Sequence, residues 1–182
     1  MTEIRVNRAP FLTVWAAVVA RRLGYDQDEA LTLGKAIAGV TAQAKGGRLG
    51  IYEPRPAAEQ EKTAAKRTEM GAERVELMDR LVPCLRTEKG LRALEGTTPS
   101  DPDSVRLYLV SKFKDALPLV EGKLTALAAC FEPSELDRQA MNLYVRMRPV
   151  VQSGEAGWGK AGTLDLEKID ALIAEQNPGG TP

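Results

Sequence analysis

The sequence predicts a mainly α-helical protein, a multi-helix single domain that carries one small β-hairpin. Two observations lead to this prediction. In most segments, apolar residues recur at helical spacing between residues that typically start and stop helices. Residues 80–94 differ, because two short apolar runs flank the sequence Thr87-Glu88-Lys89-Gly90. This pattern is typical of a β-hairpin with Gly90 at a positive φ.

The first predicted unit is a helical hairpin over residues 10–45. Its first helix ends at Gly24, which suits a left-handed helix stop. Asp26 and Glu29 have the spacing of a capping box for the second helix. That helix is expected to end near Ala44, before two consecutive glycines.

Residues 11–20 (FLTVWAAVVA) resemble the apolar part of a signal peptide. The run is shorter than the roughly 20 residues that a bilayer requires. Arg21 and Arg22 follow it, where a cleavage site needs small neutral residues. We therefore expect a buried helix in a cytoplasmic protein with no membrane partner. Two cysteines, Cys84 and Cys130, are too few for a disulfide framework and fit a reducing compartment.

The middle of the chain is predicted as a linker over residues 46–58, followed by a helix and the β-hairpin over residues 59–95. The helix is rich in Ala, Glu, Lys and Arg, so most of it should be exposed. It is expected to reach the core only near its end, and Pro83 is expected to break it. The residues that would provide its core face are Val75, Met78 and Leu81.

Helices are predicted again over residues 103–175, with residues 177–182 as a flexible tail. Asp115 is a candidate cap that would place Pro118 at the third position of its helix. Thr163 and Asp165 are alternative caps for the last short helix. The expected helices run over residues 104–114, about 116–131, 133–147 and up to 174.

Composition excludes several kinds of chemistry. The chain has 182 residues and no histidine, so it has no His-based catalytic triad and no His-ligated zinc or haem. Two cysteines alone cannot make a structural zinc site. The 25 basic and 25 acidic residues balance, which gives no general attraction to nucleic acid. We expect no metal, no cofactor and no enzymatic activity.

The glycine-rich segment 154–162 is the first candidate binding feature. Its sequence satisfies the GxGxxG pattern, and it matches a P-loop except that Ala161 replaces the required Ser or Thr. Phosphate-binding loops of both kinds follow an apolar strand, and no apolar strand precedes this segment. The favoured interpretation is a tight turn around a buried Trp158, and the alternative is a phosphate-ligand site. The residues of that candidate anion site are Arg146, Arg148, Gly157, Trp158, Gly159 and Lys160.

Residues 16–35 also fit a helix-turn-helix template with Gly24 at the turn. The residues that would face DNA at the start of the second helix include Asp26 and Asp28, although a groove flanked by phosphates favours basic or amide side chains there. In this alternative, the predicted hairpin at 82–94 acts as a wing. The candidate DNA-contacting residues are Gln27, Thr32, Lys45, Arg48, Arg86, Lys89 and Arg92. As ordinary surface residues, the charged members of this set would be solvated.

Three stretches together resemble a family of uncharacterised bacterial helical proteins. They are WAAVVARRLGYDQDEALTLGKAIAGVTAQAKG, VPCLRTEKGLRAL and LYVRMRPVVQSGEAGWGKAGTLDLEKI. The shared order is a helical hairpin, a short VP…GLRA segment and an Arg-Pro…Gly-Trp-Gly…Leu-Asp-Leu ending. The resemblance implies one compact unit in a bacterial protein, and it implies no function or site residue.

The sequence thus favours a non-catalytic protein-interaction or regulatory module. Helical hairpins packed against other helices often leave an apolar groove or a self-association surface. A protein partner or a second copy is therefore the expected ligand. The alternatives are the DNA-binding regulator and the phosphate-ligand protein described above.

Overall fold

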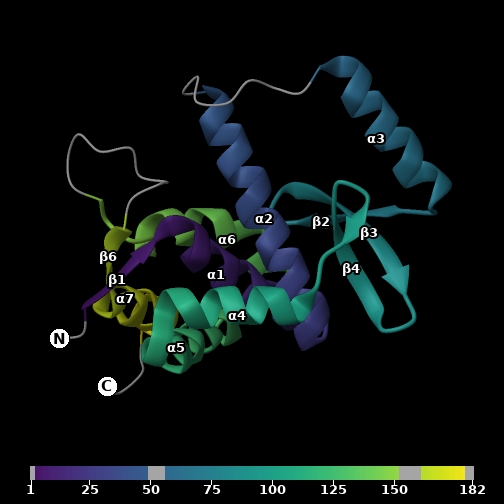
Figure 1. The fold of residues 1–182 in the computed structure, drawn as a ribbon. Helices are drawn as coiled ribbons and strands as arrows, with labels where there is room; N and C mark the ends of the chain where they lie inside the picture. Colours follow the sequence, from purple (N-terminus) through teal and green to yellow (C-terminus); the bar gives the residue numbers. More distant parts are fainter. Residues whose placement is uncertain (1–2, 49–55, 152–160, 179–182) are drawn as a thin grey trace.

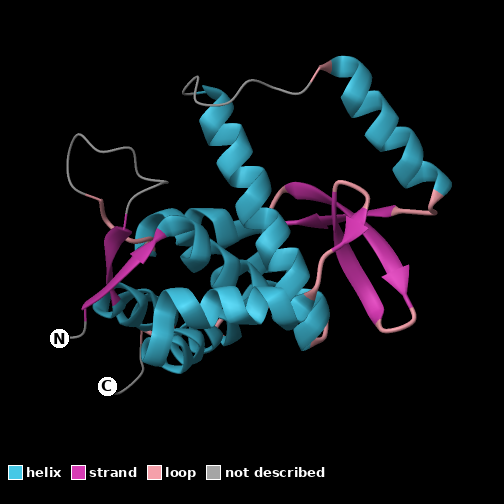
Figure 2. Ribbon diagram, in the orientation of Figure 1, coloured by secondary structure: helices cyan, strands magenta, loops and turns pink. Residues whose placement is uncertain are grey.

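A computed structural model describes residues 3–48, 56–151 and 161–178 of the chain. Helices dominate it, accompanied by one four-stranded and one two-stranded antiparallel sheet (Figure 1; coloured by element type in Figure 2). The predicted mainly-α class is confirmed. The elements are β1 (Glu3–Asn7), α1 (Arg8–Arg22), α2 (Gln27–Arg48), α3 (Ala57–Glu69), β2 (Glu73–Leu77), β3 (Arg80–Thr87), β4 (Gly90–Glu95), β5 (Thr98–Pro99), α4 (Pro102–Phe113), the 3-10 turn η1 (Lys114–Ala116), α5 (Leu117–Ala129), α6 (Pro133–Met147), β6 (Ala161–Asp165) and α7 (Leu166–Gln176).

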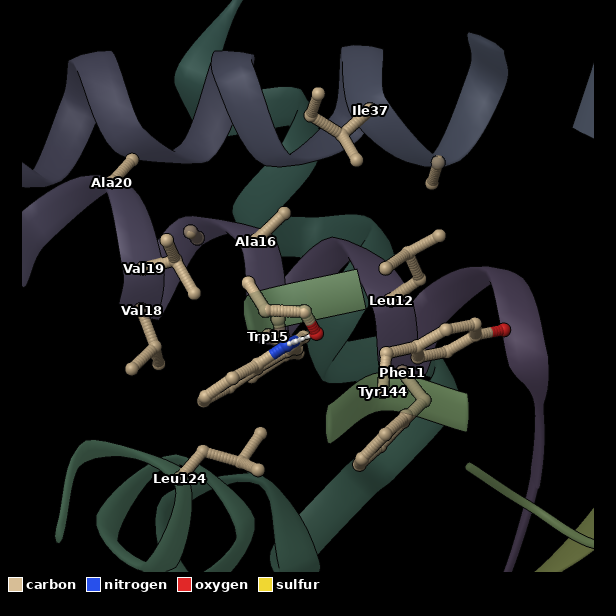
Figure 3. Packing of buried hydrophobic residues seen from close by; sticks show 14 of the residues in the cluster. Phe11, Leu12, Trp15, Ala16, Val18, Val19, Ala20, Ile37, Leu124 and Tyr144 are labelled. Atoms are coloured by element: carbon tan, nitrogen blue, oxygen red, sulfur yellow. Dashed lines mark hydrogen bonds between the residues drawn. The ribbon is translucent and has the colours of Figure 1, made fainter. Parts of the chain in front are cut away.

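Helix α1 lies at the centre of the fold. All side chains from Pro10 to Ala20 are buried, since the helix is apolar on every side and contacts α2, α4, α5 and α6. Trp15 is fully buried, and its indole N–H donates to the carbonyl of Ala140 in α6 at 2.9 Å (Figure 3). The apolar run therefore forms the buried helix that the sequence predicted. Within the described ranges, no helix has both the length and the apolar character that crossing a membrane requires.

The predicted hairpin of α1 and α2 and its capping box are confirmed. Gly24 has a φ of +112°, as the turn requires. The backbone N–H of Asp26 donates to Glu29 Oε1 at 3.0 Å, and the N–H of Glu29 donates to Asp26 Oδ1 at 2.8 Å. Helix α2 continues to Arg48, so the pair of glycines that was expected to end it lies inside its last turn.

The two helices touch backbone to backbone at Gly34. A Cβ atom at this position would lie 2.4 Å from the carbonyl oxygen of Thr13 and 2.9 Å from the amide nitrogen of Ala17. Both distances are much shorter than a normal van der Waals contact. Glycine at position 34 therefore sets how closely α2 can approach the buried helix.

The predicted β-hairpin is confirmed and is part of a larger sheet, with strand order β2-β3-β4-β5. Thr87 pairs with Gly90, whose φ is +119°. The predicted helix before it is confirmed only as far as Glu69, and none of its described side chains is buried. Its expected continuation to Leu81 is wrong.

Residues 73–77 form β2 instead of the end of that helix. Val75 and Leu77 alternate with exposed residues, which is the period of a half-buried strand. Met78 and Asp79 both have positive φ and form the tight turn into β3. Leu81, expected in the core, is 56% exposed. Pro83 lies within β3 opposite Arg74 and does not terminate a helix.

The pairing of β1 with β6 was not predicted. It joins the start of the chain to the segment before α7, with Ile4 opposite Leu164 in its register. Val150 adds an isolated bridge to Thr163. Asp165 ends β6 and caps α7, because its carboxylate accepts the N–H of Glu167 at 2.9 Å. Of the two alternative caps, the structure therefore has Asp165.

The C-terminal helices follow the prediction closely. Asp101 caps α4 by accepting the N–H of Asp103 at 3.0 Å. The prediction that Asp115 caps the next helix is wrong, because Asp115 lies inside a 3-10 turn and α5 starts at Leu117 without a side-chain cap. Pro118 therefore stands at its second position and not at the third. Its missing N–H has no intrahelical role at either position.

Candidate functional site

The start of α2 packs against the edge of β4 that faces away from β3. Glu29 Oε2 accepts the backbone N–H of Leu91 at 2.9 Å. One helical turn later, Thr32 Oγ1 accepts the N–H of Ala93 at 3.1 Å. Strand β5 pairs with β4 just beyond these residues, starting at Leu94. Side chains of α2 therefore satisfy strand N–H groups that an unprotected edge would expose.

This packing removes part of the surface that the helix-turn-helix alternative requires. Thr32 is completely buried, so it cannot contact DNA while α2 stays on β4. Leu31, next to it, is 2% exposed. Asp28 forms an ion pair with Arg106 of α4 at 3.0 Å. At the start of α2, Gln27 is exposed to solvent.

The residues of the proposed wing differ from one another in burial. Arg92 was expected to be solvated, and instead it is 6% exposed and donates to the carbonyl of Leu91 at 2.9 Å. Arg86 is exposed and pairs with Glu73 at 3.0 Å. Lys89 is exposed in the turn between β3 and β4. The side chains of the two remaining candidates, Lys45 and Arg48, lie outside the described residues.

Of the candidate anion-site residues, the structure describes Arg146 and Arg148, which have different partners. Arg146 forms an ion pair with Glu175 of α7 at 2.6 Å, so its charge is already balanced. Arg148, two residues later, is half-buried, and its guanidinium carbon lies 6.0 Å from the centre of the Tyr144 ring. The other predicted members, Gly157, Trp158, Gly159 and Lys160, lie outside the described residues.

The structure adds two residues to Arg148 that the sequence did not single out, Arg8 and Tyr144. Arg8 is the first residue of α1, and its Nε–H donates to the carbonyl of Pro149 at 2.9 Å. Tyr144 in α6 is 2% exposed and its ring stacks on Phe11. Its hydroxyl is enclosed and lies beside the guanidinium of Arg148, and its O–H has no acceptor among the described residues. We call Arg8, Arg148 and Tyr144 the arginine–tyrosine cluster.

The charges in the arginine–tyrosine cluster affect the pKa values of its members. Burial and then the nearby charge of Arg148 lower the pKa of Arg8. Burial raises the pKa of Tyr144 to about 12, although the charges of Arg148 and Arg8 and a side-chain hydrogen bond with Arg148 favour its ionised form. Neither arginine forms an ion pair with a described carboxylate. The cluster therefore combines two positive groups with a buried hydroxyl.

The spacing of four residues between Tyr144 and Arg148 is local to α6, but no sequence pattern could have added Arg8 to them. Arg8 and Pro149 are 141 residues apart, and the β1–β6 pairing brings their segments together. An arginine at a helix start also has no motif of its own. Elsewhere in the described ranges, no group of three or more Cys, Asp or Glu side chains is placed to hold a metal ion.

The three stretches that carry the family resemblance fall mainly on α1–α2, β3–β4 and the α6–α7 region. They pack into the same fold around α1. Membership of that family remains a prediction. No protein-family model, no curated protein and no solved structure matches this chain.

Proposed function

We propose that this protein is a non-catalytic cytoplasmic interaction module, and that it associates with a second copy of itself through the outer face of α4. The observation that carries the proposal is Leu107, which is 71% exposed, more than any other large apolar side chain among the described residues. Val110, one turn further along the helix, is 48% exposed. Removing two neighbouring apolar side chains from water favours association. The free thiols of Cys84 and Cys130 are consistent with a reducing compartment.

Charges at the two ends of this face support a second copy as the partner. Asp103, Leu107 and Val110 follow one another at spacings of four and three, which place them on one stripe of α4. Lys114 follows the end of the helix, with a φ of +52°. Asp103 is 79% exposed and pairs with Arg106 at 2.5 Å, but Arg106 also pairs with Asp28, so the charge of Asp103 is only partly balanced. Lys114 is also exposed. The stripe is therefore acidic at its start, apolar in its middle and basic at its end.

A stripe with this order is complementary to itself when reversed. In an antiparallel pair of α4 helices, Leu107 lies against Val110 of the partner subunit. Asp103 then lies near Lys114 of the partner subunit, and the two-fold axis repeats both contacts. Because a single pair of 12-residue helices is smaller than a standard interface, the association should be weak and reversible.

Sedimentation velocity over a concentration series tests the proposal. The wild-type protein should shift from monomer towards dimer as its concentration rises, and Leu107→Ser should remain monomeric. Val145→Ser is the matched control, since Val145 is 52% exposed but lies on α6. A wild-type protein that stays monomeric throughout, or an equal effect of both substitutions, would overturn the proposal.

Charge reversal tests the arrangement of the two copies. Asp103→Lys and Lys114→Asp should each weaken association, because each places like charges opposite one another. The double variant restores opposite charges across the two-fold axis and should recover dimerisation. Additive weakening in the double variant would exclude the antiparallel arrangement.

A further inference from the structure

We propose that the arginine–tyrosine cluster binds a small oxyanion of the phosphate class between the guanidinium groups of Arg8 and Arg148. This site is independent of the proposed association, because it lies where β1 leads into α1 and where α6 ends, and not on α4. It also differs from the anion site expected from the sequence, since Arg146 is paired with Glu175 and Arg8 takes its place.

Both arginines have guanidinium N–H groups that can donate hydrogen bonds to an anion. Arg8 uses its Nε–H on the carbonyl of Pro149, which orients the guanidinium and leaves both terminal nitrogens available. Arg148 is held against the ring of Tyr144. No described carboxylate pairs with either guanidinium group, so the two positive charges repel each other. An anion that accepts hydrogen bonds from both would convert this repulsion into attraction.

The hydroxyl of Tyr144 is the second, independent observation. It is buried beside Arg148, which can donate to its oxygen, and its own O–H has no acceptor among the described residues, which is uncommon in folded proteins. Figure 3 shows this hydroxyl pointing away from Trp15, towards the chain at the start of α1. The charges of both Arg148 and Arg8 act on this hydroxyl. An oxygen of an anion bound there would accept a hydrogen bond from the Tyr144 hydroxyl.

The start of α1 adds positive potential from the backbone. Asn7 provides no side-chain cap, and the first turn has no acidic residue. The amide groups at a helix start carry a partial positive charge that favours anions. In a helix of 15 residues, this contribution has the same sign as the two arginines.

A tetrahedral oxyanion fits these donors best. It has enough oxygens to accept from two guanidinium forks and a hydroxyl at once, whereas a single carboxylate has two. The phosphate group can come from inorganic phosphate or from an organic phosphate monoester. The two sources share the same recognition chemistry and can be separated by experiment.

Isothermal titration calorimetry tests the site with inorganic phosphate and with glycerol phosphate, at an ionic strength held constant with chloride. The wild-type protein should bind at least one of these ligands. Binding of phosphate alone indicates a closed site for the free ion, and binding of both indicates that the site admits an organic substituent. Binding of neither to the wild-type protein would overturn the proposal.

Variants identify the residues. Arg148→Gln should weaken binding about tenfold or more, because it removes a charged donor. Tyr144→Phe removes one oxygen and should weaken binding about twofold to tenfold. Arg146→Gln is the matched control, since it removes the same charge two residues away and should leave binding unchanged. Equal losses in Arg146→Gln and Arg148→Gln would show a general charge effect and exclude the site.

Thermal unfolding without and with phosphate provides a readout that separates binding from folding. Phosphate should raise the melting temperature of the wild-type protein and of Arg146→Gln, but not that of Arg148→Gln. Without phosphate, Arg148→Gln should be at least as stable as wild type, because it relieves repulsion with Arg8. A large loss of stability in this variant without phosphate would instead show that Arg148 has a structural role.

Discussion

Glu29 accepts a hydrogen bond from the backbone N–H of Leu91, 62 residues further along the chain, at 2.9 Å. The other oxygen of the same carboxylate accepts the N–H of Asp26 in the capping box at 3.0 Å. One side chain thus starts α2 and attaches it to the edge of β4. These two hydrogen bonds, that from Leu91 first, lower the pKa of Glu29.

Replacing Glu29 should destabilise the protein. Glu29→Ala removes the acceptor of two backbone donors and should lower the free energy of unfolding by about 1–3 kcal/mol. Urea denaturation measures the change. Glu59→Ala is the control, because Glu59 also lies in the first turn of a helix but is exposed on α3, and its effect should be within about 0.5 kcal/mol. Equal effects of the two substitutions would contradict the role of Glu29.

The contribution of Glu29 should depend on pH. Because its pKa is lowered in the folded protein, its stabilisation is fully present above the unfolded-state value of about 4.3 and is lost as the pH falls through the folded value. The stability difference between wild type and Glu29→Gln should therefore be constant near neutral pH and shrink in acid. A difference that stays constant from pH 7 to pH 3 would contradict this prediction.

A methyl group at position 34 should separate α1 from α2. Gly34→Ala would place Cβ 2.4 Å from the carbonyl oxygen of Thr13, so the helices must move apart at a cost of about 1–3 kcal/mol or more. Gly39→Ala, on the same helix, meets no atom within 4 Å and should stabilise by up to about 1 kcal/mol through helix propensity. Thermal unfolding of the two variants should therefore shift in opposite directions. A neutral Gly34→Ala would contradict the close contact.

The two cysteines should react at different rates. Cys84 is fully buried, and burial raises the pKa of its thiol to about 12, so it is both inaccessible and protonated. Cys130 is half-buried at the end of α5. Labelling with a maleimide near neutral pH should modify Cys130 first and Cys84 only after denaturation, as followed by mass spectrometry. Rapid labelling of native Cys130→Ser would show that Cys84 is accessible.

Two arginines of the predicted hairpin should differ in their effect on stability. Arg92 is buried and hydrogen-bonded to the carbonyl of Leu91, so Arg92→Ala should cost about 1–3 kcal/mol. Arg86 forms an exposed ion pair, and Arg86→Ala should cost less than about 1 kcal/mol. Urea denaturation distinguishes them. Similar small losses would show that Arg92 behaves as a surface charge.

Most elements set by neighbouring residues were predicted, although Thr163 was left as an alternative to the cap at Asp165 and Asp115 was wrongly expected to cap α5. The capping box of Asp26 and Glu29, the hairpin turn from Thr87 to Gly90 and the cap at Asp165 all depend on groups within three or four positions of one another. Capping and turn-forming interactions act over that range, so the local sequence pattern is sufficient to predict these features. The ten-residue apolar run in α1 likewise predicted a buried helix, since no face of it is polar.

Strand β2 shows where local pattern becomes ambiguous. Val75, Met78 and Leu81 have a helical spacing of three, whereas Val75 and Leu77 have the spacing of a strand. Pairing with β3 decided between them, because the strand buries Val75 and Leu77 and leaves Leu81 outside. Local periodicity alone cannot decide between a helix and a strand for these residues.

The candidate sites depended most on tertiary structure. Arg148 was recognised in the sequence, but its neighbour Arg8 follows from the β1–β6 pairing, and the burial of Tyr144 follows from the packing of α6 on α1. The burial of Thr32 and Arg92 likewise follows from the docking of α2 on β4. The residues therefore determined the helices, their caps and the hairpin turn, whose energies arise between near neighbours. Tertiary structure decided which charges are paired, buried or left facing one another, because burial and Coulomb interaction depend on distances between segments far apart in the chain.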